Sequence, residues 1–413
     1  MKIKRENKDL IKFLQELVRT NSVNPYSPEE SIKVKEPIEK EVAALIYEKL
    51  KDFGLKPKFV SATKNRPNVV CSLKRKGKPV LILNGHMDTV DVGDKRKWKF
   101  DPFSAKIVGN KLFGRGSADC KGGLASMIFA MKKLLEHEKE IDGNVIFCAV
   151  VDEEPGACSE IGSKLLLKRG LKGDACIICE PGTEKIAIGH RGGYRFKLIT
   201  YGEAVHTGKS EWERRERGVN AVTKMAKILL ALEKLELDYK PSEIFPNRTP
   251  VLTPGTVIKG GTNINVVPDK CEALCDVRLL PNQTKEKVKR QIIDRILQIK
   301  KDDPELKFAI QDLIYVPPVY ISKNERIVQV LYEVAKKVLK RDFRLEGSGP
   351  WSDAHFFINK NIPTVMFGPD GKNAHAENEF VFIDSVIKLS EIYAKTAIKF
   401  CSINKQFAKK NKN

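Results

Sequence analysis

The chain has 413 residues, 41% of them hydrophobic, so it can bury a large core and should fold unaided, with two domains or one domain carrying an insertion. Lys and Arg exceed Asp and Glu by 74 − 53 = +21. The basic residues are spread along the chain without a nucleic-acid-binding motif, so a generally charged surface is favoured over nucleic acid binding. No apolar run reaches membrane-spanning length and the N-terminus lacks the apolar core of a signal peptide, so we expect a cytoplasmic protein that does not associate with membranes.

Nine cysteines, an odd number, lie mostly among apolar residues, as Cys148 does. This usage predicts buried thiols and a reducing compartment. The pairs Cys176 with Cys179 and Cys271 with Cys275 leave a four-thiolate zinc site as an alternative. We favour it less, because both pairs lie in strand-like segments and Cys176 and Cys179 would point to opposite faces.

The first part of the chain alternates between strand and helix patterns, which predicts a mostly parallel sheet. Gly85-His86-Met87-Asp88 lies at the carboxyl end of the strand at 80–84, and ligand-binding residues gather at such carboxyl ends in α/β folds. In chain order the expected elements are a helix at 6–20, strands at 69–73 and 80–84, a helix at 122–138, a strand at 144–151, a helix at 159–169 and a strand at 174–179.

The pattern changes from about residue 186. Strands at 194–201, 255–258, 270–279 and 307–313 with helices at 218–237 and 284–300 predict a small α+β domain. Val316-Pro317-Pro318 has the composition of a linker. A helix at 325–340 and a strand at 364–367 then resume the first pattern, so the middle segment is an insertion.

Metal ligands occur in five segments next to predicted strand ends and turns. Imidazole nitrogen and carboxylate oxygen together suit zinc, with cobalt or manganese as alternatives. The segments contain His86 with Asp88, Asp119, Glu153 with Glu154, Glu180, and His375.

A pair of zinc ions needs a shared carboxylate to offset the repulsion between them, and Asp119 is the natural bridge. His86 and Glu180 would complete one metal site. Glu154 and His375 would complete the other, which leaves open positions for water and a substrate carbonyl.

The two remaining carboxylates have separate expected roles. Asp88 lies two residues beyond His86 and would orient its imidazole. Hydrolysing an amide requires a water made nucleophilic by the metals and a carboxylate that accepts its proton. Glu153 is free to be that general base, because adjacent side chains on an extended chain point oppositely and Glu154 can ligate while Glu153 faces the water.

From about residue 10 to 400 the chain resembles the zinc aminoacylase, acetylornithine deacetylase, succinyl-diaminopimelate desuccinylase and carboxypeptidase G family. The resemblance implies an α/β, mostly parallel-sheet zinc-peptidase catalytic domain (phosphorylase/hydrolase-like) at 1–189 and 315–413. It also implies an inserted α+β ferredoxin-like lid that dimerises, at 190–314. The motifs are Gly85-His86-Met87-Asp88-Thr89-Val90, Asp119-Cys120-Lys121-Gly122-Gly123, Asp152-Glu153-Glu154, Glu180-Pro181 and Ala374-His375-Ala376-Glu377-Asn378-Glu379.

The resemblance also implies roles for lid residues. His206 in Val-His-Thr-Gly matches a histidine, often donated by the second subunit, that stabilises the oxyanion of the tetrahedral intermediate. Asn265 and Arg278 resemble lid residues that contact substrate, and an arginine suits a carboxylate. A homodimer is therefore expected.

The segment 348–353 resembles the glycine-rich substrate loop of the deacetylase branch, which makes Gly349 and Ser352 candidates for substrate binding. Trp351 interrupts the run of small residues, and His355 stands where an arginine is common in the family. The specificity of this loop therefore departs from the family pattern.

The function we expect is hydrolysis of the amide of an N-acyl amino acid or related small substrate, of the acetylornithine deacetylase or succinyl-diaminopimelate desuccinylase type. A dipeptidase or carboxypeptidase is the alternative. Glu180 favours the first weakly, because within the family deacylases and carboxypeptidases usually have Glu at that position and aminopeptidase-like members have Asp. A catalytically silent basic binding protein is a third hypothesis, which would require the loss of a ligand or the base, and none is missing.

Overall fold

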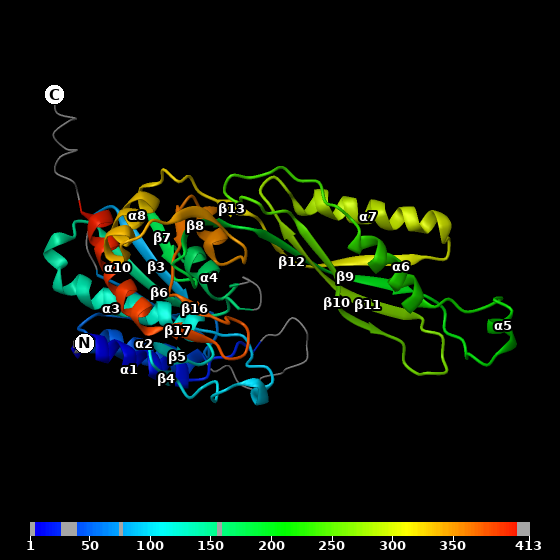
Figure 1. Cartoon of the computed structure of the whole chain (residues 1–413), viewed down its shortest axis with the longest axis horizontal. Helices are drawn as coiled ribbons and strands as arrows, with labels where there is room; N and C mark the ends of the chain where they lie inside the picture. The colour runs from blue at the N-terminus through cyan, green and yellow to red at the C-terminus, as the bar shows by residue number, and fades with distance from the viewer. Residues whose placement is uncertain (1–4, 26–38, 74–76, 155–158, 403–413) are drawn as a thin grey trace, which may run out of the picture. The chain divides into compact units, whose positions relative to one another are not determined.

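The computed structural model describes residues 5–25, 39–73, 77–154 and 159–402, which fall into two compact units. The first unit comprises Met1–Gly189, Tyr320–Gly347 and Ser352–Asn413, and the second comprises His190–Val319 and Ser348–Trp351. The elements of both are labelled in Figure 1. None of the helices in the described ranges is long and apolar enough to cross a membrane.

A mixed sheet forms the centre of the first unit, in the order β1-β2-β6-β3-β7-β15-β8-β13, with β14 also paired to β8. Its middle is parallel, because β3 pairs in parallel with β6 and β7, and β7 with β15. This arrangement confirms the α/β prediction. The strands are β1 (Lys58–Ser61), β2 (Pro67–Ser72), β3 (Val80–His86), β6 (Asn144–Val150), β7 (Ala175–Ile178), β8 (Lys185–His190), β13 (Val319–Tyr320), β14 (Arg344–Ser348) and β15 (Thr364–Met366).

The helices of this unit cover the sheet, and α3 packs beside α10 (Figure 1). At the start of α3, a Cβ on Gly123 would lie 2.5 Å from the Cβ of Cys179, so glycine lets the helix approach the end of β7 closely. The helices are α1 (Arg5–Arg19), α2 (Glu39–Asp52), α3 (Gly122–Glu136), α4 (Ser163–Lys168), α8 (Arg326–Leu339), α9 (Ala354–Ile358) and α10 (Ile383–Cys401).

The helix expected at 159–169 is shorter than predicted, since α4 begins at Ser163. Ser159 has a positive φ of 25°, which is not helical. Its N–H donates to the carbonyl of Asp152 at 2.9 Å and its hydroxyl to Asp353 at 2.9 Å. These contacts hold residues 159–162 as a turn against the end of β6 instead of a first helical turn.

A small antiparallel sheet, in the order β16-β17-β5-β4, was not expected from the sequence. Its strands are β4 (Lys106–Val108), β5 (Lys111–Phe113), β16 (Gly371–Lys372) and β17 (Phe380–Phe382). The pairing of β17 with β5 brings the loop that contains His375 beside the turn that contains Asp119, although the two residues are far apart in the sequence.

The second unit has the order β9-α6-β10-β11-α7-β12 and one antiparallel sheet in the order β10-β11-β9-β12, which is the ferredoxin-like topology. Its core is formed by residues of β9 and β11 packed against α6 and α7 (Figure 1). The elements are β9 (Gly192–Tyr201), α5 (Ser210–Glu213), α6 (Ala221–Glu233), β10 (Val251–Gly260), β11 (Lys270–Leu279), α7 (Lys285–Asp302) and β12 (Lys307–Val316).

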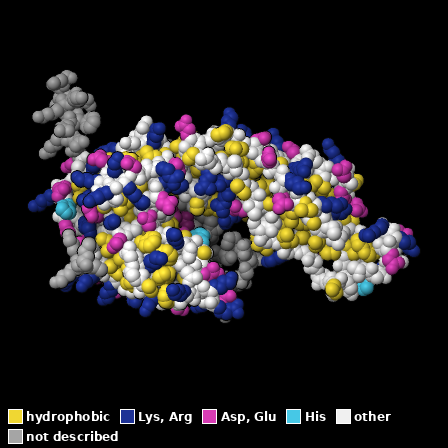
Figure 2. Space-filling view, in the orientation of Figure 1, with side chains coloured by type: hydrophobic (Ala, Val, Ile, Leu, Met, Phe, Trp, Pro, Cys, Tyr) yellow, Lys and Arg dark blue, Asp and Glu magenta, His cyan; other side chains and the backbone are white. Residues whose placement is uncertain are grey.

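The surface is charged in both signs. On the face shown in Figure 2, Lys and Arg side chains alternate with Asp and Glu side chains. On this face, acidic side chains therefore lie among the basic side chains that give the chain its net charge of +21. The cysteines in the described residues, eight in all, are buried and not in disulfides.

Candidate metal centre

The first unit brings Asp119 between two histidines. His86 is the last residue of β3, and its Nε2 lies 3.1 Å from Oδ1 of Asp119. Nε2 of His375 lies 3.1 Å from Oδ2 of the same carboxylate. Asp119 itself is in an irregular turn, Ser117–Lys121, which follows Gly116 at a φ of 80°. The arrangement gives each carboxylate oxygen its own imidazole, as a bridging ligand requires.

Two groups of potential ligands share Asp119. His86, Asp119 and Glu180 form one group, and Asp119, Glu154 and His375 form the other, with the ligand atoms of each group within 4.8 Å of one another. Oε2 of Glu154 lies 3.1 Å from Nε2 of His375. Ligand atoms around a tetrahedral zinc ion are roughly 3.3 Å apart, because each is about 2.0–2.1 Å from the metal. The observed spacings fit such ions.

Unpaired oxygen atoms support the same conclusion. Oε1 of Glu154 and Oε1 of Glu180 are buried and have no hydrogen-bond partner among the described residues. Burial and the nearby charges of Asp119 and Glu154 raise the pKa of Glu180 to about 8, although His86 acts in the opposite direction. Buried carboxylate oxygens without partners are costly, and a divalent cation offsets that cost. The residues of this chain therefore fit a pair of metal ions.

Glu153 is buried beside this cluster and belongs to neither ligand group. Burial raises its pKa well above the ordinary value of a glutamate, and the charge of Glu180 adds to the effect. A carboxylate with a raised pKa accepts a proton more readily, which is the property required of a general base.

Asp88 lies next to the histidine that it was expected to orient, but its contacts differ in detail. Nδ1 of His86 is 2.9 Å from the backbone oxygen of Asp88 and 3.8 Å from its carboxylate. The carboxylate instead accepts the backbone N–H of Glu153 at 3.3 Å and of Glu154 at 3.0 Å. It also accepts the side-chain amide of Asn24 at 2.7 Å. The Asp88 carboxylate thus fixes the backbone of the Glu153-Glu154 pair, and its main chain holds the imidazole.

Glu379 is a site residue that sequence reasoning did not assign. Its carboxylate accepts backbone N–H groups from Gly116, Ala118 and Asp119 at 2.9–3.1 Å, and Arg115 donates to it at 2.7 Å. Glu379 is fully buried. The only signal in the sequence is its place at the end of the motif that contains His375.

The second unit holds the candidate lid residues. His206 is exposed, its Nδ1 accepts the N–H of Gly208 at 3.1 Å, and its Nε2 lies 3.2 Å from the side-chain amide nitrogen of Asn265. The N–H of Thr207 donates to the carbonyl of Asn265 at 2.9 Å. His206 and Asn265 therefore lie together on neighbouring loops, although the sequence separates them widely.

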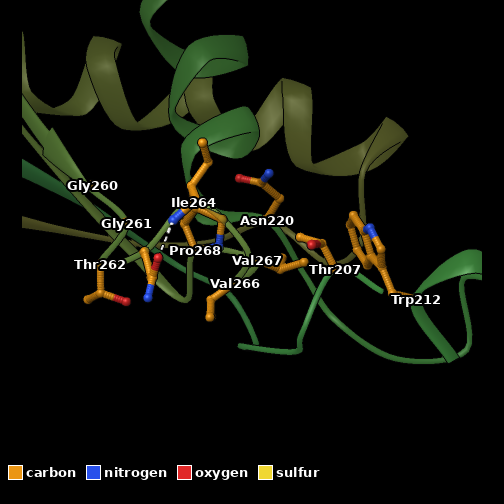
Figure 3. A pocket seen from close by; sticks show the side chains of 11 residues that line it. Thr207, Trp212, Asn220, Gly260, Gly261, Thr262, Ile264, Val266, Val267 and Pro268 are labelled. Carbon is orange, nitrogen blue, oxygen red and sulfur yellow. Dashed lines mark hydrogen bonds between the residues drawn. The ribbon is translucent and has the colours of Figure 1, made fainter. Parts of the chain in front are cut away.

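A pocket of about 510 Å³ borders these loops (Figure 3). Its walls come from the loop after β10 and from the segment around Thr207 and Trp212. Ile264 lines it and is 98% exposed. An apolar side chain this exposed on a loop beside His206 is available for contact with another molecule.

Arg278 lies on β11, where its Nε donates to Asp276 at 2.7 Å and its guanidinium lies 4.3 Å from the ring centre of Trp351. The indole also lies 4.8 Å from the guanidinium of Arg195. A Cβ on Gly193 would be 1.6 Å from this indole, so glycine makes room for it. Trp351, which interrupts the expected run of small residues, therefore packs against Arg278, the arginine expected to bind substrate.

The two candidates from the glycine-rich loop are separated by the structure. Gly349 belongs to the second unit and Ser352 to the first. Ser352 is buried, and its hydroxyl donates to the sulfur of Met366 at 3.1 Å. No described contact links Ser352 to the ligand groups.

The comparisons with known proteins agree with this architecture. A model of peptidase family M20/M25/M40 matches residues 82–399, and the chain belongs to that family. It is 29% identical to an N-formyl-4-amino-5-aminomethyl-2-methylpyrimidine deformylase of Halalkalibacterium halodurans, over 83% of this chain and 84% of the relative. It is 31% identical to a succinyl-diaminopimelate desuccinylase of Ehrlichia canis, over 79% and 84%. The structure of an M20 family metallo-carboxypeptidase from Sulfolobus solfataricus superposes with a TM-score of 0.75 at 22% identity, covering 96% of this chain and 99% of that one. The chain is thus a hydrolase of a metal-dependent family that acts on amide or peptide bonds.

Proposed function

We propose that this enzyme is a two-zinc amidohydrolase that removes an acyl group from a small amine or amino acid. The observation that carries the proposal is the position of Asp119 between His86 and His375, with a second carboxylate completing each ligand group. Glu153 stands beside these groups without belonging to either. Such a set supplies the metal ligands and the carboxylate base that metal-assisted amide hydrolysis uses.

Each residue of the site would have a separate role in the reaction. His86, Asp119 and Glu180 would hold one ion, and Asp119, Glu154 and His375 the other. When bound, the ions would polarise the substrate carbonyl and make water acidic enough to attack it near neutral pH. The carboxylate of Glu153 would take the proton from that water and deliver it to the leaving nitrogen.

The second unit would serve as a dimerising lid. His206 would stabilise the negative charge that develops on the carbonyl oxygen, and Asn265 lies in contact with it. Arg278 would bind a carboxylate of the substrate, and Asp276 and Trp351 support its guanidinium on two sides. We also propose that the protein is a homodimer, in which His206 of one subunit acts on the substrate bound by the other.

The names of two relatives favour an acyl substrate over a peptide. The curated relatives named above are a deformylase and a desuccinylase, and both names describe removal of an acyl group from nitrogen. Glu180 agrees with the deacylase and carboxypeptidase branches and argues only against an aminopeptidase-like enzyme. A small metabolite of this kind, together with buried free thiols, supports location in the cytoplasm.

A substrate panel tests the proposal. Zinc-loaded protein would be incubated with N-formyl, N-acetyl and N-succinyl derivatives of amino acids and aminomethyl heterocycles, alongside dipeptides and N-acyl peptides with a free carboxylate. We expect one acyl compound to be turned over far faster than any peptide, and the activity to disappear in Glu153→Ala. A preference for peptides would place the enzyme with the dipeptidases or carboxypeptidases instead.

A further inference from the structure

Arg66 is a buried cation close to the metal centre for which neither the sequence motifs nor the proposed reaction gives a role. Arg66 is 3% exposed, and its side chain lies between α2 and the end of β6. Nε donates to Glu39 at 2.9 Å and Nη2 donates to the same carboxylate at 2.5 Å. Nη1 donates to Oδ1 of Asp152 at 3.1 Å. One guanidinium therefore joins the first residue of α2 to the residue that precedes Glu153.

Asp152 has an unusual backbone conformation. Its φ is +74°, in the left-handed region that residues other than glycine seldom adopt. Such a conformation persists only where the surrounding contacts determine it. The contacts at Asp152 include the Arg66 guanidinium and, at 3.5 Å, the N–H of Ile161 on its carboxylate, and the N–H of Ser159 on its carbonyl oxygen.

The turn at Asp152 sets the direction of the two glutamates that follow. The strand β6 ends at Val150, so Glu153 and Glu154 are not aligned by sheet hydrogen bonds. Their N–H groups donate to Asp88, which fixes the far side of the turn. Arg66 and Asp88 thus hold the Asp152-Glu153-Glu154 segment from its two sides.

The energetics of the buried ion pair between Arg66 and its carboxylates argue against a role for Arg66 in stability alone. Burial lowers the pKa of Arg66, but the carboxylates of Glu39, Asp152 and Asp88 more than offset this and raise it, whereas burial raises the pKa of Glu39 to about 7 in spite of Arg66. A buried ion pair is weak evidence for stability, since desolvating the charges can cost more than their attraction returns. What such a group does provide is one fixed geometry.

We propose that Arg66, held by Glu39, is a positioning residue of the metal centre, which keeps Asp152 in its left-handed turn so that Glu154 points to a metal and Glu153 does not. The inference rests on the proposed function, because it assigns Glu153 and Glu154 their separate roles. Arg66 itself touches neither substrate nor metal in this scheme.

Four variants test the inference. In Arg66→Lys the charge remains, but a single ammonium cannot reproduce the forked contact with both carboxylates. Asp152→Ala removes the acceptor and disfavours the positive φ, whereas Asp152→Asn keeps an acceptor oxygen and tolerates that φ. The double variant Arg66→Lys/Asp152→Ala reports whether the two residues act through each other. Lys224→Met is the matched control, because Lys224 forms a buried ion pair with Asp303 at 2.5 Å in the second unit.

We expect Arg66→Lys and Asp152→Ala each to lower kcat by about 10- to 100-fold with little change in KM. They should weaken binding of one of the two zinc ions by a similar factor, measured by calorimetric titration of the metal-free protein. The double variant should be no worse than the poorer single one, and Asp152→Asn should restore most of the activity. Lys224→Met should lower the melting temperature without changing kcat or zinc binding.

The inference would be overturned if kcat and zinc affinity of Arg66→Lys were close to the wild-type values. It would also be overturned if the double variant showed the product of the two single effects, or if Lys224→Met lost as much activity and zinc affinity as Arg66→Lys. If Arg66→Lys does not fold, the comparison of Asp152→Ala with Asp152→Asn decides, since equal losses in both would contradict the role of the turn. Normal activity of Glu153→Ala would instead overturn the proposed function. If Glu153→Ala were inactive while Arg66→Lys had normal activity, the role of Arg66 would be refuted and the proposed function would still stand.

Discussion

The carboxylate of Glu379 accepts the backbone N–H of Asp119 at 3.1 Å, so a residue at the end of the last motif directly supports the ligand at the centre of the site. The same carboxylate accepts the N–H groups of Gly116 and Ala118 and a hydrogen bond from Arg115. These contacts hold the turn that presents Asp119. They also tie that turn to the loop containing His375.

Glu379→Gln should therefore weaken zinc binding. The amide nitrogen of glutamine is a donor and would face N–H donors where one carboxylate oxygen accepts them now. We expect a loss of about 10- to 100-fold in affinity, the range seen when groups that support metal ligands are removed. Equilibrium dialysis against a zinc buffer measures it.

Glu377→Gln is the control for that experiment. It makes the same change in the same motif, at a half-exposed residue whose carboxylate lies 3.7 Å from Lys97. Zinc affinity should remain at the wild-type value in Glu377→Gln. Equal losses in the two variants would show that Glu379 has no special part in holding Asp119.

Substitution of the two neighbouring glutamates, Glu153 and Glu154, should have different effects on zinc content and turnover. Glu153→Ala should retain both zinc ions and lose about 100- to 10,000-fold in kcat, the usual contribution of a general base. Glu154→Ala should lose one of the two ions, because Glu154 belongs to a ligand group with Asp119 and His375. Metal analysis by atomic emission together with turnover measures both. Loss of zinc from Glu153→Ala, with both ions retained in Glu154→Ala, would reverse the assignment.

Hybrid dimers test the role of the lid histidine. If His206 acts on the substrate of the partner subunit, a mixture of His206→Ala and Glu153→Ala proteins should regain activity, because one site of each hybrid is then intact. A mixture of Glu153→Ala with Glu154→Ala should stay inactive, since each site keeps a defect. Absence of recovery in the first mixture, with subunit exchange verified by mass spectrometry, would mean that His206 does not act between subunits.

Acid should weaken the second unit through Asp312. Burial alone would raise the pKa of this carboxyl, but hydrogen bonds from Lys289, Tyr194 and Lys285 lower it to about 2. The folded form therefore gains stability from the ionised group above the ordinary pKa of 3.8, and loses that gain as the pH falls towards 2.

Asp312→Asn isolates this effect. The difference in free energy of unfolding between wild type and Asp312→Asn should be present near pH 6 and should vanish as the pH approaches about 2. Urea denaturation across this range measures it, with Asp294→Asn, at an exposed position of α7, as the control. A difference that does not change with pH would show that the charge of Asp312 contributes no stability.

The sequence predicted the centre of the fold because the relevant signals are local. Alternation of strand and helix patterns predicted the mostly parallel sheet, and the strand expected at 80–84 is β3, which extends to His86. The helix expected at 6–20 corresponds to α1 at Arg5–Arg19. Each of these depends on residues close together in the chain.

What the sequence did not reveal depends on long-range contacts. The supports from Glu379 to the Asp119 turn and from Arg66 to Asp152 join segments separated by 260 and 86 residues. The contacts of the Asp88 carboxylate with the N–H groups of Glu153 and Glu154 were not predicted for the same reason, because Asp88 is far from both residues in the sequence. The stacking of Trp351 on Arg278 likewise requires the segment 348–351 to join the second unit. Periodicity and motifs do not contain that information.

Metal-free protein titrated with zinc, with turnover of the best acyl substrate followed at each addition, tests the two-metal mechanism most directly. We expect no activity without metal, and a rise to the maximum as the second equivalent binds, since both ligand groups share Asp119. Activity that is complete in the absence of metal, or complete at one equivalent and unchanged by the second, would contradict the two-zinc amidohydrolase.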